Sequence, residues 1–579
     1  MNTGKTKSAG LILAGLVVLS LVLNLWGITY GLPNRYYPDE GRIVNNALAF
    51  GLGDLNPHYF NYPALSMYLL FVLYIFYFIT GQLAGLFASA TDFQLLFFSN
   101  PSSFYLLGRG ANALVGTASV FLLYKLGRET FHNRKIGLLA GVLLATLPYF
   151  VYYSHFIVTD ILQMFFVLAS YIFIIRILRT GKLKNYFWAG ALAGLGTATK
   201  YSPIVLIVPI ALAHILYLSA NRDKFSFSRL FWFPLLAAVC LILFFLIGSP
   251  FNFLDYRSFY ESLQFRMLLG SEHTFGTADP TQTAWLIYPR LIFFHSFSVF
   301  NRLDPIGFVF VGGMIWAAVR RRKEDLLICL YPLLVYLMMG SWSFGSNRYS
   351  LPLIPFFALW GARAAVEAGE TLRKKTNREW LRRLAAGGIN GFIALVLILS
   401  LANSALGNRR LTSPDTRTLA RKWIEAKISP GTPIAIEWDT ESTIQLWETP
   451  DDIRAKIRAY ETGETETIHH TSEQMVEVHR MRLEAVPESN FRITRIGGMD
   501  GTRVKTDGYN LDDLRRGGIK YLISSEGVSH IFLEGRGQEI YPDHYRFYRR
   551  VEKELPLLAV FSPTPLLPRP PRLRIYRLN

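Results

Sequence analysis

The sequence has few charged residues and very few cysteines for its length. Only 18% of its 579 residues are Asp, Glu, Lys or Arg, and it contains 2 Cys. Cys240 and Cys329 both lie inside apolar runs, where a thiol behaves as a small hydrophobe, so no disulfide framework is predicted. A low charged fraction beside 51% hydrophobic and 15% aromatic residues is typical of several membrane spans rather than of a soluble globule.

Acidic residues are scarcer than basic ones. Lys and Arg number 60 against 42 Asp and Glu, a formal net charge of +18. Such an excess can indicate nucleic-acid binding, but membrane proteins collect Lys and Arg on their cytoplasmic loops. We therefore expect membrane lipids and no nucleic acid among the partners. No P-loop, dinucleotide-binding glycine pattern or nucleophile elbow occurs in a suitable strand-turn-helix context.

The first apolar run covers residues 9–29 and follows Lys5 and Lys7. About 20 apolar residues can cross a bilayer, and no small-residue cleavage pattern follows, so we expect an uncleaved helix with a cytoplasmic N-terminus. Basic clusters near residues 125–135, 176–184, 222–229, 320–323 and 373–383 should lie on the same side. About eleven spans satisfy them: residues 9–29, 108–126, 136–154, 161–179, 186–200, 203–220, 229–249, 305–320, 326–341, 349–367 and 385–402. The odd count places the C-terminal part outside.

Two further apolar stretches, residues 63–90 and 284–303, do not fit as single crossings. Both lie between segments that the charge distribution places on the outer side. Each is therefore expected to lie in the interface, to re-enter the membrane or to cross it twice. These three alternatives stay open at the level of sequence.

From about residue 407 the chain becomes charged and polar. A Ser-Pro-Asp start with apolar Leu419, Trp423 and Ile424 predicts a helix, and a strand is expected over Pro433–Glu437. Further patterns predict a strand near 490–496, a helix and strand within NLDDLRRGGIKYLISS, a helix near 542–553 and a terminal strand in RLRIYRL. We predict a mainly helical membrane bundle over residues 1–406 and an extracytoplasmic α/β domain over 407–579.

Ionisable groups at the outer ends of the spans are the candidate functional residues, because such groups are costly near the membrane and usually face a cavity or a partner. Asp39 and Glu40 are adjacent, so they point in different directions on a helix and should serve different partners. The simpler interpretation is that Asp39 caps the helix that continues through EGRIVNNALAF, with Glu40 in its first turn. Asp160, after Thr159, is likewise either an N-cap or a second acidic group of a reaction site.

Four basic or titratable residues accompany these carboxylates. Arg109, Arg348 and Lys200 stand at the outer ends of spans, where they either snorkel or hold a phosphate at the level of the lipid headgroups. His58 is a candidate base or donor, or else a hydrogen-bonded structural residue.

Several motifs in a fixed order resemble a known family. They are Asp39-Glu40 after the first span, YPAL about 22 residues later, GRGANALVGTASVFLLYKLGRETF, FIVTDILQMFF, AGLGTATKYSP and RYSLPLIPFFALWGARAA. Together they resemble the protein O-mannosyltransferase and aminoarabinose-transferase superfamily, glycosyltransferase family 39-like membrane enzymes of the GT-C fold. The resemblance covers about residues 9–400. One departure is Tyr62-Pro63-Ala64, where relatives commonly carry His or Lys followed by two prolines.

The resemblance implies transfer of a sugar from a polyprenyl-phosphate carrier to an acceptor on the outer side, with inversion at the anomeric carbon. By position it implies that Asp39 is the catalytic base, with Glu40 the second acidic residue of the pair and Asp160 the acidic residue that opens the fourth span. Arg109 and Arg348 would contact the phosphate. Lys200 and His58 are further candidates for binding the donor.

The acceptor class stays open among protein, lipid and glycan. No cofactor or metal is expected, because the protein mannosyltransferases this chain resembles look metal-independent, although oligosaccharyl relatives use a divalent ion. We expect an integral protein of the plasma (inner) membrane. The alternatives are a transporter or flippase of lipid-linked sugars and a purely structural membrane protein. Charged groups gathered at one boundary, rather than at the midplane, favour the enzyme.

Overall fold

The computed structural model describes residues 3–224, 226–271, 284–290, 292–293, 305–342, 347–375, 379–437, 443–465, 472–497, 499–500, 503–504, 507–534, 537–563 and 571–578. The chain divides into two compact units, each built from several segments. The first contains residues Met1–Ile28, Asn46–Phe71 and Leu107–Arg409, and the second contains Thr29–Asn45, Val72–Leu106 and Arg410–Asn579. Each unit is described by itself.

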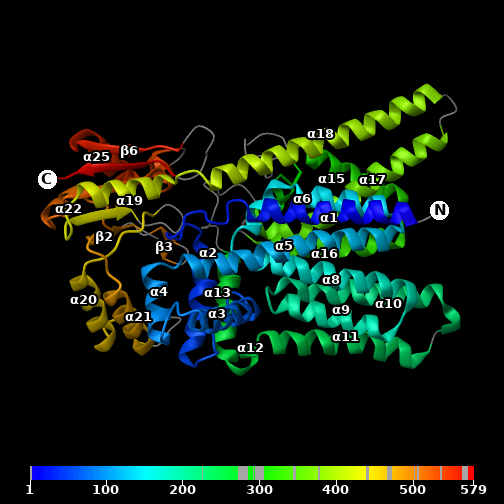
Figure 1. Cartoon of the computed structure of the whole chain (residues 1–579), viewed down its shortest axis with the longest axis horizontal. Coiled ribbons are helices and arrows are strands. Elements are labelled where there is room, and N and C mark those ends of the chain that lie inside the picture. Colours follow the sequence, from blue (N-terminus) through cyan, green and yellow to red (C-terminus); the bar gives the residue numbers. More distant parts are fainter. Residues whose placement is uncertain are drawn as a thin grey trace. The chain divides into compact units, whose positions relative to one another are not determined.

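The first unit is helical (Figure 1). Four helices run across the boundary between the units: α2 (Pro38–Ala49), α3 (Leu65–Leu83), α5 (Ser102–Phe131) and α18 (Glu379–Leu411). The others within the first unit are α1 (Thr3–Leu25), α6 (Arg134–Ala145), α7 (Pro148–Ser154), α8 (Thr159–Thr180), α9 (Leu183–Thr197), α10 (Ile207–Ala220), α11 (Phe227–Gly248), α12 (Phe251–Leu254), α13 (Tyr256–Ser271), α14 (Ala284–Arg290), α15 (Ile306–Arg320), α16 (Lys323–Gly340) and α17 (Ile354–Lys375). Short 3-10 turns are η1 (Phe50–Leu52), η2 (Ser202–Leu206), η3 (Arg222–Lys224) and η5 (Asn347–Leu353).

Each of the eleven predicted spans is found as a helix or a helix pair. By length and composition, seven helices of the described chain are able to cross a membrane, or eight if α6 and α7, bent by 64°, form one span. Two shorter apolar helices, Gly10–Leu25 and Ile306–Arg320, accompany them. The predicted class, a mainly helical membrane bundle with an attached α/β domain, is therefore confirmed, whereas the count of eleven stays a prediction.

The two uncertain apolar stretches differ in outcome. Residues 63–90 contain one long helix, α3 (Leu65–Leu83), whose 19 residues are long and apolar enough for a single crossing, and Ala90 begins α4. Two crossings would need about twice that length, so that alternative is wrong. Of residues 284–303, only α14 and residues 292–293 belong to the described chain, and the rest of that prediction lies outside it.

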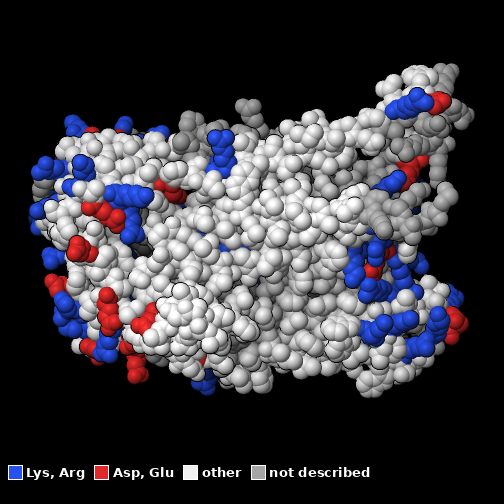
Figure 2. Space-filling view, viewed as in Figure 1, with Lys and Arg blue, Asp and Glu red and all other residues white. Residues whose placement is uncertain are grey.

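Basic residues of the first unit gather at one end of its helices (Figure 2). The ends of several helices meet there through ion pairs. Arg176 of α8 donates to Glu129 of α5 at 2.7 and 2.8 Å. Arg363 of α17 lies 4.7 Å from the Phe131 ring of α5 and pairs with Asp325 of α16. This clustering agrees with the prediction that the basic loops lie on one side of the membrane.

Small residues let two of the helices approach closely. A Cβ atom on Gly190 would lie 2.2 Å from the backbone oxygen of Ala237, and one on Gly194 would lie 2.3 Å from that of Leu241. Both glycines are on α9 and both contacts are with α11. Spacing of four residues places them on one face, the small-residue packing that membrane helices favour.

The second unit contains a mixed five-stranded sheet in the order β2-β1-β5-β7-β6. Its strands are β1 (Pro433–Glu437), β2 (Arg492–Ile496), β5 (Tyr521–Ser525), β6 (Leu557–Phe561) and β7 (Leu573–Arg577), with a separate β3 (Met499–Asp500) and β4 (Arg503–Val504) ribbon. β1 runs parallel to β2 and β5, and β7 runs antiparallel to β5 and β6. The helices are α4 (Ala90–Ser99), α19 (Thr416–Lys427), α20 (Pro450–Glu461), α21 (Ser472–Glu484), α22 (Leu511–Arg516), α23 (Glu526–Leu533), α24 (Gly537–Ile540) and α25 (Pro542–Glu554).

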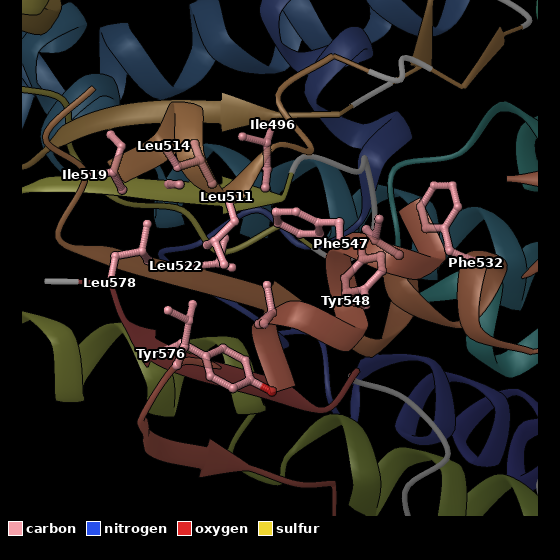
Figure 3. Close-up of a cluster of buried hydrophobic side chains, with 14 residues drawn as sticks. Ile496, Leu511, Leu514, Ile519, Leu522, Phe532, Phe547, Tyr548, Tyr576 and Leu578 are labelled. Atoms are coloured by element: carbon pink, nitrogen blue, oxygen red, sulfur yellow. The ribbon is translucent and has the colours of Figure 1, made fainter. Parts of the chain in front are cut away.

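Side chains along each strand point alternately to the two faces of the sheet, and both faces are hydrophobic. Ile434 and Ile436 pack with α19 on one face, while Ala435 faces the other. Figure 3 shows that second face, where Leu522 and Tyr576 lie among side chains of α22, α23 and α25. Side chains of a strand alternate between faces with period two, so every central strand contributes to both cores.

All the elements predicted after residue 407 are present: the helix α19, the strands β1, β2, β5 and β7, and the helices α22 and α25. The helices α20, α21, α23 and α24 and the strand β6 were not predicted. The expected boundary at residue 407 falls inside α18, which continues to Leu411. The second unit also includes residues 29–45 and 72–106.

Candidate active site

Asp160 lies in the first turn of α8 and is almost fully buried, with 1% of its surface exposed. The N-cap residue is Val158, whose side chain makes no capping hydrogen bond. The interpretation of Asp160 as an N-cap is therefore wrong. The start of a helix favours a carboxylate, but a buried charge also needs a partner, and the structure supplies one from a distant part of the chain.

Lys200 is that partner. It follows the C-terminal end of α9, and its Nζ lies 2.5 Å from Oδ1 of Asp160. The ammonium also lies 4.4 Å from the ring centroid of Tyr349. Only 14% of the lysine side chain is exposed, so snorkelling does not describe it.

Arg348 approaches the same carboxylate from η5. Its Nε lies 4.0 Å from Oδ2 of Asp160, and its Nη2 donates to the hydroxyl of Tyr62 at 2.6 Å. The residue is 8% exposed. Three of the predicted site residues, far apart in sequence, thus meet in one cluster. Asp160, Lys200 and Arg348 together carry one negative and two positive charges, and we call these three residues the cationic cluster.

Two tyrosines of this site were not predicted as functional residues. Tyr62 accepts the hydrogen bond from Arg348, and the ring of Tyr349 lies beside both Lys200 and Arg348. Tyr62 occupies the position where the resemblance leads one to expect a basic residue. Its hydroxyl orients Arg348 instead of adding a charge. The signals for these residues were the Arg-Tyr pair at 348–349 and the YPAL motif.

Polar contacts fix the segments that carry the cluster. Asn252 donates to the hydroxyl of Tyr201 at 3.0 Å, and that hydroxyl donates to the carbonyl of Phe60 at 2.8 Å. The hydroxyl of Ser249 accepts from the backbone N–H of Ala64 at 2.9 Å. Since Tyr201 follows Lys200 and Phe60 precedes Tyr62, these bonds hold both sides of the cluster in register.

Arg109 is buried in α5, with no measurable exposure. Its Nη1 donates to the carbonyl of Ile28 at 2.8 Å, and its guanidinium lies 5.5 Å from the Phe156 ring. Nearby, His155 Nε2 lies 2.9 Å from the carbonyl of Trp26. These contacts tie α5 to the end of the first predicted span, so Arg109 has a structural role, and its contact with a phosphate stays a prediction.

His58 lies in the loop before α3 and has a left-handed backbone, with φ of +45°. Its Nε2 lies 2.7 Å from Oδ2 of Asp54. In the same loop, Asn56 donates to Asp255 at 2.8 Å. Burial opposes ionisation of Asp54, but its hydrogen bonds with His58 and the backbone N–H of Asn56 outweigh burial and lower its pKa below the usual value. The structural interpretation of His58 is supported by these contacts, and its role toward a donor stays a prediction.

Asp39 and Glu40 belong to the second unit, at the start of α2. The helix begins at Pro38, so both carboxylates lie in its first turn, where they complement the helix dipole. Asp39 is therefore inside the helix rather than its cap. Glu40 is fully buried while Asp39 is partly exposed, which agrees with the expectation that the two point in different directions.

Within the described chain, no group of three or more His, Cys, Asp or Glu residues is arranged to hold a metal ion. The expected independence of metal stays a prediction.

Residues 93–247 match the family described as dolichyl-phosphate-mannose-protein mannosyltransferase. Over this range the chain resembles that family. The match confirms the resemblance predicted from the motifs, and it includes Arg109, Asp160 and Lys200. No curated protein matches the chain in sequence.

Solved structures of membrane glycosyltransferases are remotely similar. ArnT from Cupriavidus metallidurans bound to undecaprenyl phosphate is 14% identical, with a TM-score of 0.49 and coverage of 99% of this chain and 98% of that one. The archaeal oligosaccharyltransferase AglB from Archaeoglobus fulgidus, in complex with an inhibitory peptide and a dolichol-phosphate, is 13% identical, with a TM-score of 0.47 and coverage of 96% and 74%.

Proposed function

We propose that the protein is a membrane glycosyltransferase that moves a sugar from a polyprenyl-phosphate carrier to an acceptor hydroxyl or amine, with inversion at the anomeric carbon. The observation that carries the proposal is the buried cationic cluster of Lys200, Arg348 and Asp160. It occurs in a chain whose residues 93–247 match a family named for a dolichyl-phosphate sugar donor.

Lys200 and Arg348 hold the phosphate of the carrier. In the reaction, the bond between the anomeric carbon and the phosphate oxygen breaks, and negative charge grows on the departing polyprenyl phosphate. Fixed cations in a site that excludes water stabilise that charge more strongly than they would in water. Asp160 positions both cations, and Tyr62 orients the guanidinium plane of Arg348. Arg matches phosphate oxygens bidentately, which suits it to this role.

Asp39 is the base. It takes the proton of the acceptor as the acceptor atom bonds to the anomeric carbon from the face opposite the phosphate. Its position in the first turn of α2, partly exposed, suits a group that must meet a substrate. Glu40, fully buried in the same turn, is a positioning residue. The lipid-linked sugar is already activated, so the protein supplies deprotonation and charge stabilisation only.

The site is on the outer side of the membrane. Asp160 is at the start of α8 and Arg176 is near its end, about 24 Å away at 1.5 Å per residue. Arg176 belongs to the basic end of the bundle, which the charge distribution assigns to the cytoplasm. The position of the cluster at the other end of α8 supports an extracytoplasmic site, and we propose the extracytoplasmic side for residues 407–579 as well.

The test is turnover by the purified protein with a panel of labelled polyprenyl-phosphate sugars and membrane extracts as acceptors. We expect release of polyprenyl phosphate coupled to formation of a labelled product. Asp39→Asn should lose at least 100-fold in kcat, since general base catalysis contributes about 10²–10⁴-fold. The matched control is Asp451→Asn, which changes an exposed carboxylate on α20. Movement of the intact lipid-linked sugar across vesicles without transfer would instead identify a flippase.

A further inference from the structure

The second unit contains a hollow of about 340 Å³ whose lining is rich in arginine. Arg417 comes from α19, Arg482 from α21, Arg495 from β2 and Arg35 from the segment before α2. Pro38 and Gly41, in the first turn of α2, also line it. We call this hollow the arginine pocket. All of its lining residues belong to the second unit.

One of these arginines, Arg417, is paired within the fold. Arg417 donates to Asp415 at 2.7 and 2.9 Å, and its guanidinium lies 3.8 Å from the ring centroid of Tyr36. It also donates to the hydroxyl of Tyr30 at 2.9 Å. Its charge is balanced by a buried carboxylate, so Arg417 forms a wall of the pocket and does not account for its positive character.

The remaining charges around the pocket do not balance. Glu448 is 6% exposed and lies 2.5 Å from Lys456, so it already has one cation. Arg482 and Arg495 lie at 3.4 and 3.6 Å from the same carboxylate. Three cations thus share one anion. One buried carboxylate needs one well-placed cation, so the other positive charges are more than the fold requires.

Arg35 adds a fourth cation. Its backbone is fixed by Gln445, which accepts from the N–H of Arg35 at 3.1 Å and donates to its carbonyl at 2.7 Å. Within the described part of the chain, no carboxylate forms an ion pair with the Arg35 side chain. The two backbone hydrogen bonds therefore fix the position of Arg35 in the wall of the pocket.

The pKa of Arg482 agrees with this excess of positive charge around the pocket. Burial lowers the pKa of Arg482, Glu448 opposes that effect, and the positive charges of Arg35 and Arg495 lower the pKa further. Like charges held together in this way repel one another, and a bound anion would relieve the repulsion. The first turn of α2 also lines the pocket, and its dipole is complemented by Asp39 and Glu40, so these arginines alone account for the positive character of the pocket.

We propose that the arginine pocket binds a phosphate-bearing group, and that in the proposed transfer reaction this group belongs to the acceptor. The assignment to the acceptor rests on the proposed function, whereas phosphate binding itself does not. Arg35, Arg482 and Arg495 provide planar donors that match phosphate oxygens. The volume is at the lower end of the range for small-molecule sites, which suits a phosphate with one sugar or glycerol unit. The source is either a soluble phosphorylated sugar or a lipid headgroup.

Binding is measured on the full-length protein, with glucose 6-phosphate by calorimetry in detergent, and with nanodiscs that contain phosphatidic acid or only phosphatidylcholine. We expect saturable binding of one of the two phosphate probes. The double variant Arg35→Gln/Arg495→Gln should weaken it at least tenfold, because Glu448 keeps Lys456 and Arg482. Arg454→Gln, an exposed arginine of α20, is the matched control and should bind as wild type.

Separate results distinguish a soluble phosphate from a lipid headgroup, and phosphate binding by the arginine pocket from the proposed sugar transfer. Binding of glucose 6-phosphate indicates a soluble phosphate, and binding confined to phosphatidic acid nanodiscs indicates a lipid headgroup. In the transfer assay, the double variant should raise KM for the acceptor with kcat within twofold. Failure of both probes to bind, or equal binding by the double variant and Arg454→Gln, overturns the pocket. Phosphate binding without any sugar transfer would overturn the proposed function and leave the pocket standing.

Discussion

The ammonium of Lys200 lies 2.5 Å from a carboxylate oxygen of Asp160, although 40 residues separate them in sequence. Both groups are largely buried in the helical unit. Charges in such a place are expensive to desolvate, so their pairing explains how the fold tolerates them. Arg348 approaches the same carboxylate, so two cations surround one anion.

The Asp160–Lys200 pair gives the first prediction. Asp160→Asn removes the carboxylate and leaves a buried ammonium without it, which should cost about 3–5 kcal/mol of stability. The double variant Asp160→Asn/Lys200→Gln should recover part of that loss, because the buried ammonium is removed together with the carboxylate, although Arg348 still loses its ion pair. Thermal unfolding in detergent measures both.

Activity separates this structural role from the functional one. The double variant should remain inactive in sugar transfer although it is stable, since it lacks a cation that holds the phosphate. Wild-type turnover by a stable double variant would show that the pair serves the fold alone.

The Tyr62 hydroxyl gives the second prediction. Tyr62→Phe removes the oxygen that accepts from Arg348 at 2.6 Å, and hydrogen bonds to charged groups are worth about 1.5–3 kcal/mol. We expect an increase of about tenfold or more in KM for the carrier-linked sugar, with the protein still folded. Tyr201→Phe, which loses the bond to the Phe60 carbonyl, should instead lower thermal stability. Identical effects of the two variants on KM would contradict the role given to Tyr62.

Glu437 on β1 predicts a pH dependence of stability. The carboxyl is 1% exposed, and burial raises its pKa to about 7, although the backbone N–H of Ser525 donates to it at 2.7 Å. The folded state then binds its proton more tightly than the unfolded state, whose carboxyl has a pKa near 4.5. The free energy of unfolding should therefore fall as pH rises from about 4.5 to about 7, by up to about 3 kcal/mol from this group.

Unfolding of Glu437→Gln across the same pH range is the comparison. The difference in the free energy of unfolding between wild type and variant should show this decrease with rising pH, since the other titrating groups are common to both. A difference that does not change with pH would mean that Glu437 is ionised in the folded protein.

The packing of α9 against α11 gives a further prediction. Gly194→Val places side-chain atoms where a Cβ alone already lies 2.3 Å from a backbone oxygen, so the helices must separate. Overpacking of this kind costs about 1–3 kcal/mol or more. Gly388→Val, in α18 with nothing within 4 Å of a Cβ, is the control. If both variants lose equal thermal stability, the cause is the helix propensity of valine rather than the packing of α9 against α11.

Much of the fold was predictable from sequence because its signals are local. Apolar runs gave a helix or helix pair for each predicted span, although only seven helices of the described chain, or eight with the bent pair, are long and apolar enough to cross a membrane. Alternation in PIAIE gave β1 to the residue. Strand β6 was missed because its five residues, LLAVF, lie between prolines and do not alternate. For residues 63–90 three alternatives stayed open, and only the one with two crossings is wrong, because the charge distribution constrains loops and says little about the helix between them.

The site was predictable as a set of residues but not as an arrangement. Asp160, Lys200 and Arg348 were each singled out by being ionisable at the end of an apolar run. Spacing along the chain contains no information on whether Lys200 turns toward Asp160 or toward lipid headgroups, and the N-cap preference of Asp favoured the wrong interpretation. Tyr62 was missed because the YPAL motif marks its position but does not show that its hydroxyl accepts a hydrogen bond from Arg348.

The most direct measurement is the affinity of the purified protein for polyprenyl phosphate, compared among wild type, Arg348→Gln and Arg383→Gln. Arg383 is an exposed arginine of α18 whose side chain is 79% accessible, and its loss should leave affinity unchanged. We expect Arg348→Gln to bind at least tenfold more weakly, which corresponds to about 1.4 kcal/mol. Equal affinity of wild type and Arg348→Gln would contradict the claim that the cationic cluster holds the phosphate of a lipid carrier.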